Sequence, residues 1–115
     1  MPEGVQQFTF LVQGSGEQPY KASFLLSNHA LNAFCTCQAG QNGTVCKHRL
    51  SILAGSISGI ISDNAHEVEM VVAHLPGTPL AGALDQLVTA EIAAERAKAE
   101  LASAKKAVAR AMHHG

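Results

Sequence analysis

The stretch AFCTCQAGQNGTVCKHRL, residues 33–50, contains all three cysteines of the 115-residue chain. The first two, Cys35 and Cys37, are separated by a single residue. On an extended strand, side chains two positions apart point to the same face, so both sulfurs are directed to one side and Thr36 to the other. This spacing predicts that Cys35 and Cys37 bind the same metal ion.

A second pair of candidate ligands follows in the same stretch. Cys46 and His48 come after a loop of eight residues, which contains two glycines and an asparagine that allow the backbone to reverse sharply. Three thiolates and one imidazole form a ligand set of structural zinc sites. The sequence therefore predicts that one zinc ion joins a strand to the start of a helix, with Cys35, Cys37, Cys46 and His48 as its ligands.

Two other interpretations compete with zinc binding. In the first, the cysteines are redox-active or hold another metal. In the second, they are simply buried, and His48 lies on a solvated helix. A disulfide framework is disfavoured, because three is an odd number of cysteines. An open catalytic zinc site is also not expected, because four protein ligands leave no vacant coordination position.

The pattern Cys-x-Cys, a short loop and Cys-x-His resembles the SWIM-type zinc finger. The resemblance covers residues 20–55, and Cys35, Cys37, Cys46 and His48 match the four ligand positions of that family one for one. It implies a β-β-α unit in which the last two ligands open the helix. It also implies a module that takes part in protein–protein or DNA interactions.

The segment before the first cysteine has the pattern of a half-buried antiparallel sheet. Apolar residues alternate with other side chains over residues 8–12 and again over residues 20–26. Turn-forming residues follow each run, and residues 31–37 form a third expected strand. The sequence therefore predicts a three-stranded meander whose last strand carries the first cysteine pair.

The segment from residue 47 to residue 75 combines helical and irregular features. Leu50, Leu53 and Ile57 follow the histidine ligand at helical spacing, whereas the glycines and serines around them weaken the later part of that helix. Residues 66–75 fit either a short helix or a strand. The pattern alone does not choose between these two structures.

A long helix is predicted for residues 80–112. Thr78 provides an N-cap, Pro79 occupies the first helical position, and the segment after Gly82 consists largely of strong helix formers. One heptad position holds aliphatic residues that are mostly large, and the position three residues later is always alanine. These two series form the predicted helix interface: Leu80, Ala83, Leu87, Ala90, Ala94, Ala97, Leu101, Ala104, Val108 and Ala111.

This heptad seam predicts close packing against another helix. A helix of about 33 residues is about 50 Å long, too long for a small domain to cover. We therefore expect the helix to pair with a second copy of the chain, and docking on a partner protein or packing within the chain are the alternatives. Acidic residues lie toward its start and basic residues toward its end, which complements the helix dipole.

The predicted fold class is α+β, with a small antiparallel β-meander and a zinc-clamped β-β-α finger followed by the long C-terminal helix. The expected domains are a zinc-binding domain at residues 1–60 and a connecting segment with a short helix at residues 61–78. Residues 79–113 form the helix for dimerisation or docking.

Composition and charge narrow the functional classes. The formal net charge is −1, whereas nucleic-acid-binding domains are usually basic. The sequence has neither the pattern of a signal peptide nor a long apolar run, so we expect a cytoplasmic protein that does not bind membranes. It has no phosphate loop, nucleophile elbow or metalloprotease helix, so neither catalysis nor a small-molecule substrate is expected.

We therefore predict a non-enzymatic zinc module that mediates protein–protein interaction, as a homodimer or with a partner protein bound through the C-terminal helix. The alternative is a DNA-binding protein in which Lys21, Lys47 and Arg49 contact phosphates. Residues 1–57 carry these three cations and two acidic residues, a net charge of +1. Three cations can contact only a few phosphates, and a dimer would double the number of these contacts.

Overall fold

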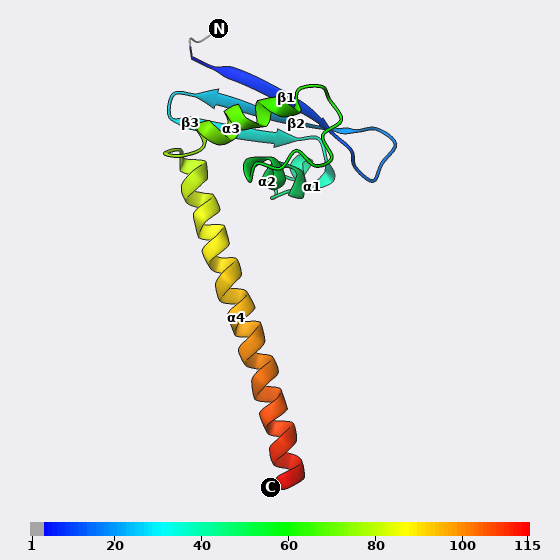
Figure 1. The fold of residues 1–115 in the computed structure, drawn as a ribbon, viewed down its shortest axis with the longest axis vertical. Helices are drawn as coiled ribbons and strands as arrows, with labels where there is room; N and C mark the ends of the chain where they lie inside the picture. Colours follow the sequence, from blue (N-terminus) through cyan, green and yellow to red (C-terminus); the bar gives the residue numbers. More distant parts are fainter. Residues whose placement is uncertain (1–3) are drawn as a thin grey trace. The chain divides into compact units, whose positions relative to one another are not determined.

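The computed structural model describes residues 4–115, and its first part is a three-stranded antiparallel sheet in the order β1-β2-β3 (Figure 1). The strands are β1 (Gln6–Val12), β2 (Tyr20–Ser27) and β3 (Ala30–Cys35). The register places Phe8 opposite Phe24 across the first two strands. The α+β class and the predicted meander are confirmed.

One face of the sheet forms the hydrophobic core of this first part of the chain. Every second residue of β1 and β2 is buried over most of each strand, and the rings of Phe10 and Phe24 meet edge to face with their centroids 5.9 Å apart. Two helices, α2 (Lys47–Leu53) and α3 (Val68–His74), contact β3 and β2 respectively (Figure 1). Their buried side chains are Ile52, Leu53, Val68 and Val71.

Helix α2 is shorter than its apolar spacing predicted. Gly55 follows it with a φ of +91°, and the N–H of Ser56 donates to the carbonyl of Ser51 over 3.0 Å. A left-handed glycine with this hydrogen bond is the Schellman arrangement that ends many helices. Ile57, the next residue at helical spacing, therefore lies outside the helix and is 58% exposed.

The segment after α2 pairs with the outer edge of β1. The N–H of Gln13 donates to the carbonyl of Gly59 over 2.7 Å, and the N–H of Ile61 donates to the carbonyl of Leu11 over 2.8 Å. These bonds satisfy backbone groups that an edge strand otherwise exposes. They also attach the segment that leads to α3 to the sheet.

Helix α3 shows that residues 66–75 form a helix rather than a strand. A short 3₁₀ turn, η1 (Ala65–Glu67), leads directly into it. Its two buried residues, Val68 and Val71, are three positions apart and so lie on one face of the helix. That face is the one that packs in the core.

His74, at the end of α3, fastens the turn between β2 and β3. Its Nε2 atom donates to the carbonyl of Ala30 over 3.1 Å and lies within hydrogen-bond distance of the carbonyl of Ser27. A carbonyl only accepts hydrogen bonds, so Nε2 carries a proton. The end of the helix and the tip of the hairpin are thereby held together.

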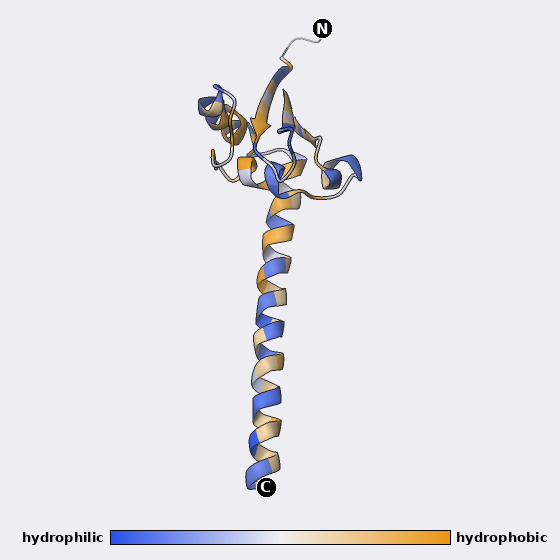
Figure 2. Ribbon diagram, turned by 90° about the vertical axis from the view of Figure 1, so that its right-hand side faces the viewer, coloured by the Kyte–Doolittle hydropathy of each residue, from blue (hydrophilic) through white to orange (hydrophobic). Residues whose placement is uncertain are grey.

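Helix α4 (Pro79–His114) begins at the predicted residue. The hydroxyl of Thr78 accepts the N–H of Ala81 over 3.2 Å and donates to the carbonyl of Leu75 over 2.7 Å, so the predicted N-cap is confirmed. In Figure 2 apolar residues are densest in the first turns of α4.

The chain divides into two compact units, one that ends at Ala81 and one from Gly82 to Gly115. We call the first of these the zinc unit below, because it contains the candidate ligands. The functional subdivision at residues 60 and 78 stays a prediction. No helix within residues 4–115 is both long enough and apolar enough to span a membrane.

Candidate metal centre

Four side chains from neighbouring elements converge on one point. Cys35 ends β3, Cys37 precedes a one-turn helix, α1 (Gln38–Gln41), and Cys46 and His48 lie at the start of α2. One ligand atom of each residue lies within 4.8 Å of all the others, and the three cysteines are buried. The structure therefore brings together all four predicted ligands.

The spacing of these atoms fits a zinc ion. Zn–S bonds of about 2.3 Å and a Zn–N bond of about 2.0 Å, at tetrahedral angles, place ligand atoms about 3.5 to 3.8 Å apart. The sulfur of Cys35 and Nδ1 of His48 are 3.7 Å apart. The cluster thus fits one zinc ion, and four protein ligands complete its tetrahedral coordination.

Strand β3 ends at Cys35, earlier than predicted, but the extended pairing continues to Thr36. The N–H of Thr36 donates to the carbonyl of Lys21 over 3.0 Å, and its hydroxyl accepts the N–H of Lys21 over 2.9 Å. Thr36 is exposed while the cysteines on either side are buried. The predicted same-face arrangement of Cys35 and Cys37 is therefore confirmed.

The loop between the two ligand pairs contains helix α1, which the residue pattern did not predict. Cys37 is its N-cap, and the Cys37 sulfur accepts the N–H of Gly40 over 3.4 Å. A Cβ atom at Gly40 would lie 2.2 Å from the carbonyl oxygen of Cys35. Glycine is therefore needed at position 40 because the backbone passes so close to the end of β3.

The thiols of the cluster differ in their acidity. Burial, together with the side chains of Cys37 and Cys46, raises the pKa of Cys35 to about 12, against an opposing contribution from the Cys37 backbone N–H. Burial also acts to raise the pKa of Cys46, but hydrogen bonds from Arg49 and Cys37 outweigh it and lower that pKa. Zinc coordinates thiolates, so its binding at Cys35 displaces a proton.

The imidazole of His48 is held in the form that coordinates metal. Burial lowers its pKa, and the positive charge of Lys47 lowers it further. The neutral imidazole is therefore favoured over the imidazolium, and only the neutral ring has a lone pair for zinc.

Arg49 connects the cluster to the elements around it. Its Nε atom donates to the sulfur of Cys46 over 3.1 Å, and its Nη1 atom donates to the carbonyl of Ala33 over 3.2 Å. Its Nη2 atom donates to the carbonyl of Thr44. One guanidinium thus bonds a ligand sulfur, strand β3 and the loop between the ligand pairs, as outer-shell groups do at metal sites.

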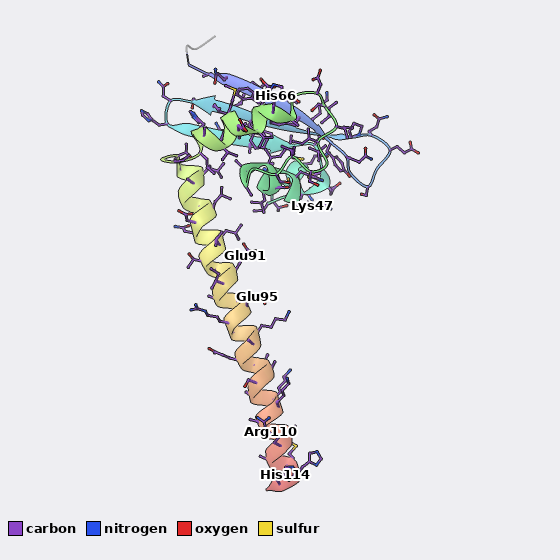
Figure 3. The ribbon with its side chains drawn as sticks, viewed as in Figure 1. Lys47, His66, Glu91, Glu95, Arg110 and His114 are labelled. Carbon is purple, nitrogen blue, oxygen red and sulfur yellow. The ribbon has the colours of Figure 1, made fainter. Side chains whose placement is uncertain are left out.

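The residues predicted to contact nucleic acid are in different surroundings. Lys21 and Lys47 are exposed, and Lys47 is labelled on α2 in Figure 3. The guanidinium of Arg49 is instead half-buried and occupied by the three internal acceptors. The role of Arg49 at the metal centre was missed because only the folded chain brings Ala33 and Thr44 to it.

We predict that the Arg49→Met variant binds zinc about 10- to 100-fold more weakly than the wild type, the usual cost of losing an outer-shell hydrogen bond. Competition with a chromophoric chelator at fixed pH measures this affinity. Lys21→Met is the matched control, because it removes an exposed charge from the neighbouring strand and should leave the affinity unchanged. Equal zinc affinity of Arg49→Met and the wild type would contradict the prediction.

Tyr20 is a second residue of this site that the pattern did not identify. Its ring lies beside the imidazole of His48, with centroids 5.0 Å apart and an interplanar angle of 43°, and it packs against the three cysteines. A Cβ atom at Gly14 would lie 2.0 Å from the Tyr20 ring. The loop between β1 and β2 therefore covers this ring, and the ring in turn shields the cluster.

The ten residues of the predicted helix interface all lie on α4. From Val88 to the end of the chain every residue of this unit is exposed, and Leu101 and Val108 of the seam are 57% and 53% exposed. Their role in an interface stays a prediction.

Residues 10–54 match the family model of the SWIM zinc finger. The matched segment begins in β1, ends just after α2 and includes all four ligand residues. The resemblance inferred from the ligand spacing is confirmed for this segment. No curated protein and no solved structure matches the chain.

Proposed function

We propose that the SWIM zinc finger at residues 10–54 is the rigid head of a non-enzymatic interaction protein, which its C-terminal helix joins into a homodimer. The observation that carries this proposal is the seam of α4, which is exposed from Ala90 onward. The zinc ion serves structure in this account, because its four protein ligands leave no position for a substrate or a reactive water.

The seam supports self-association because it leaves aliphatic surface in water from Ala90 to the end of the helix. Leu101 and Val108 of the seam are each more than half exposed, whereas Leu80 and Leu87, nearer the start of the helix, are half-buried. Burial of apolar surface is favourable by about 25 cal/mol per Å². A continuous exposed row of such residues typically marks a surface that binds another protein chain.

The surface of the zinc unit supports a protein rather than DNA as its further partner. Residues 1–81 contain three Lys or Arg and five Asp or Glu, a net charge of −2. Arg49 is engaged internally, which leaves two exposed cations. Large apolar side chains are more numerous on its surface: Phe34, Val45, Ile57, Ile61 and Met70.

DNA binding remains the second candidate, because Lys21 and Lys47 are exposed and a dimer presents each of them twice. Titration of the zinc-loaded chain with double-stranded DNA separates the two functions. We expect only weak binding, with a Kd above about 10 µM near 0.15 M salt, the range of non-specific association.

Nanomolar binding with a steep salt dependence would contradict the interaction-module proposal. In that case Lys47→Gln should reduce the slope of log K against log salt by about one, since each phosphate contact contributes about that much. Gln38→Ala, also on the exposed surface near the site, is the uncharged control and should leave the slope unchanged.

A further inference from the structure

We propose that α4 pairs with α4 of a second copy in an antiparallel orientation, in a register that sets Leu80 of one chain at the level of Ala111 of the other. This inference rests on the proposed homodimer and specifies its interface. The exposure of the α4 seam from Ala90 onward, its alternation of residue size and its distribution of charge support it.

The sizes of the seam residues favour the antiparallel orientation. In a parallel in-register pair each residue meets its own copy, so Leu87 would meet Leu87 and Ala90 would meet Ala90. Wide and narrow layers would then alternate, and the alanine layers would leave voids in a contact that is otherwise close-packed. An antiparallel pair instead brings the aliphatic series of one helix against the alanine series of the other.

One register of the antiparallel pair sets a large residue opposite an alanine in every layer except the central one. With Leu80 at the level of Ala111, each large residue is opposite an alanine, and the central layer pairs two alanines. The layers are Leu80 with Ala111, Ala83 with Val108, Leu87 with Ala104, Ala90 with Leu101, and Ala94 with Ala97. The seam therefore overlaps over its full length, with one uniform distance between the helix axes.

The charges of α4 favour the same orientation. Asp85, Glu91 and Glu95 are the only charged residues up to position 95 of the helix, whereas Lys and Arg are the only charged residues after Glu100. Figure 3 labels Glu91 and Glu95 in one half and Arg110 near the other end. Antiparallel pairing sets the acidic half against the basic half twice, while parallel pairing sets like charges together.

The proposed register also gives a specific ion pair at the edge of the seam. Glu91 and Lys98 each follow an alanine of the seam, so both flank the contact. In this register Glu91 lies about two residues, or about 3 Å along the axis, from the level of Lys98 in the second copy. The two-fold symmetry of the dimer produces this pair twice.

The orientation of the two α4 helices determines the distance between the points at which the two zinc units are attached to the dimer. Leu80 of one copy and Leu80 of the other would be about 47 Å apart along the axis, because 31 residues at about 1.5 Å per residue separate positions 80 and 111. A parallel pair would bring both attachment points together. The antiparallel dimer is therefore a spacer that presents one zinc unit at each end to separate partner sites.

Disulfide trapping in the zinc-loaded full chain tests the orientation. We expect Ala90→Cys and Leu101→Cys to cross-link with each other when the two single variants are mixed, exchanged and mildly oxidised. Neither variant alone should cross-link, because two copies of position 90 would be about 16 Å apart, beyond the reach of a disulfide. Intact mass under non-reducing conditions identifies each product, and the wild type controls for its native cysteines.

The possible outcomes distinguish a wrong orientation or register from the absence of a dimer. If Ala90→Cys cross-links with itself, the dimer is parallel and the inference is wrong. If a dimer forms neither this disulfide nor the one between positions 90 and 101, the proposed register is wrong. A wild-type chain that light scattering shows to be monomeric overturns the proposed function itself. As a second readout, Glu91→Lys or Lys98→Glu should weaken the dimer several-fold, and the double variant should restore it.

Discussion

Removal of zinc is expected to unfold the zinc unit. The ion connects β3, α1 and α2 through Cys35, Cys37, Cys46 and His48, and the three buried thiols would otherwise face one another. Zinc binding in comparable structural sites contributes on the order of 10 kcal/mol. Since a domain of this size is stable by about 5 to 15 kcal/mol in total, loss of the ion removes most or all of that stability.

Circular dichroism during titration with a strong chelator measures this unfolding. We expect the cooperative thermal transition of the zinc unit to disappear and to return when excess zinc is added. Cys37→Ser should reproduce the effect without chelator, whereas His29→Ala, which alters an exposed turn residue outside the cluster, should not. A melting curve that chelation leaves unchanged would contradict the structural role of the metal.

The second large effect is expected from Ala97→Arg, which places a long cation in the middle of the α4 seam. In the proposed register Ala97 meets Ala94 of the second copy, where no space exists for a guanidinium. Burial of an unpaired charge costs about 3 to 5 kcal/mol, so dimerisation should weaken by roughly a hundredfold or more.

Size-exclusion chromatography with light scattering checks this result. The wild type should elute as a dimer and Ala97→Arg as a monomer, with the zinc content of both unchanged. Ala99→Arg is the matched control, because position 99 lies on the opposite side of the helix from the seam and should leave the dimer intact. A dimer that survives Ala97→Arg would show that another surface holds the copies together.

The features that the sequence predicted correctly are those with a local signature. The alternation around Phe10 and Phe24 predicted the strands, the spacing of the cysteines predicted the metal cluster, and Thr78 with Pro79 predicted the start of α4. In each case the interacting groups or repeating positions are close in the chain. Their geometry therefore follows from the period of the strand, the loop or the helix cap.

The features that the sequence did not predict depend on contacts between distant residues. Arg49 acquires its role only when Ala33 is folded beside it, and Gly59 pairs with Gln13 across more than forty positions of the chain. The choice of helix for α3 is of the same kind. Its apolar run fits both structures, and packing of Val68 and Val71 in the core decides between them.

Native mass spectrometry of the zinc-loaded full chain checks both the metal centre and the pairing through α4, because it counts chains and metal ions in one particle. We expect a dimer that carries two zinc ions, in a narrow range of low charge states typical of folded protein. A monomer with one zinc ion would contradict the pairing through α4. A folded, compact chain without zinc would contradict the structural metal centre.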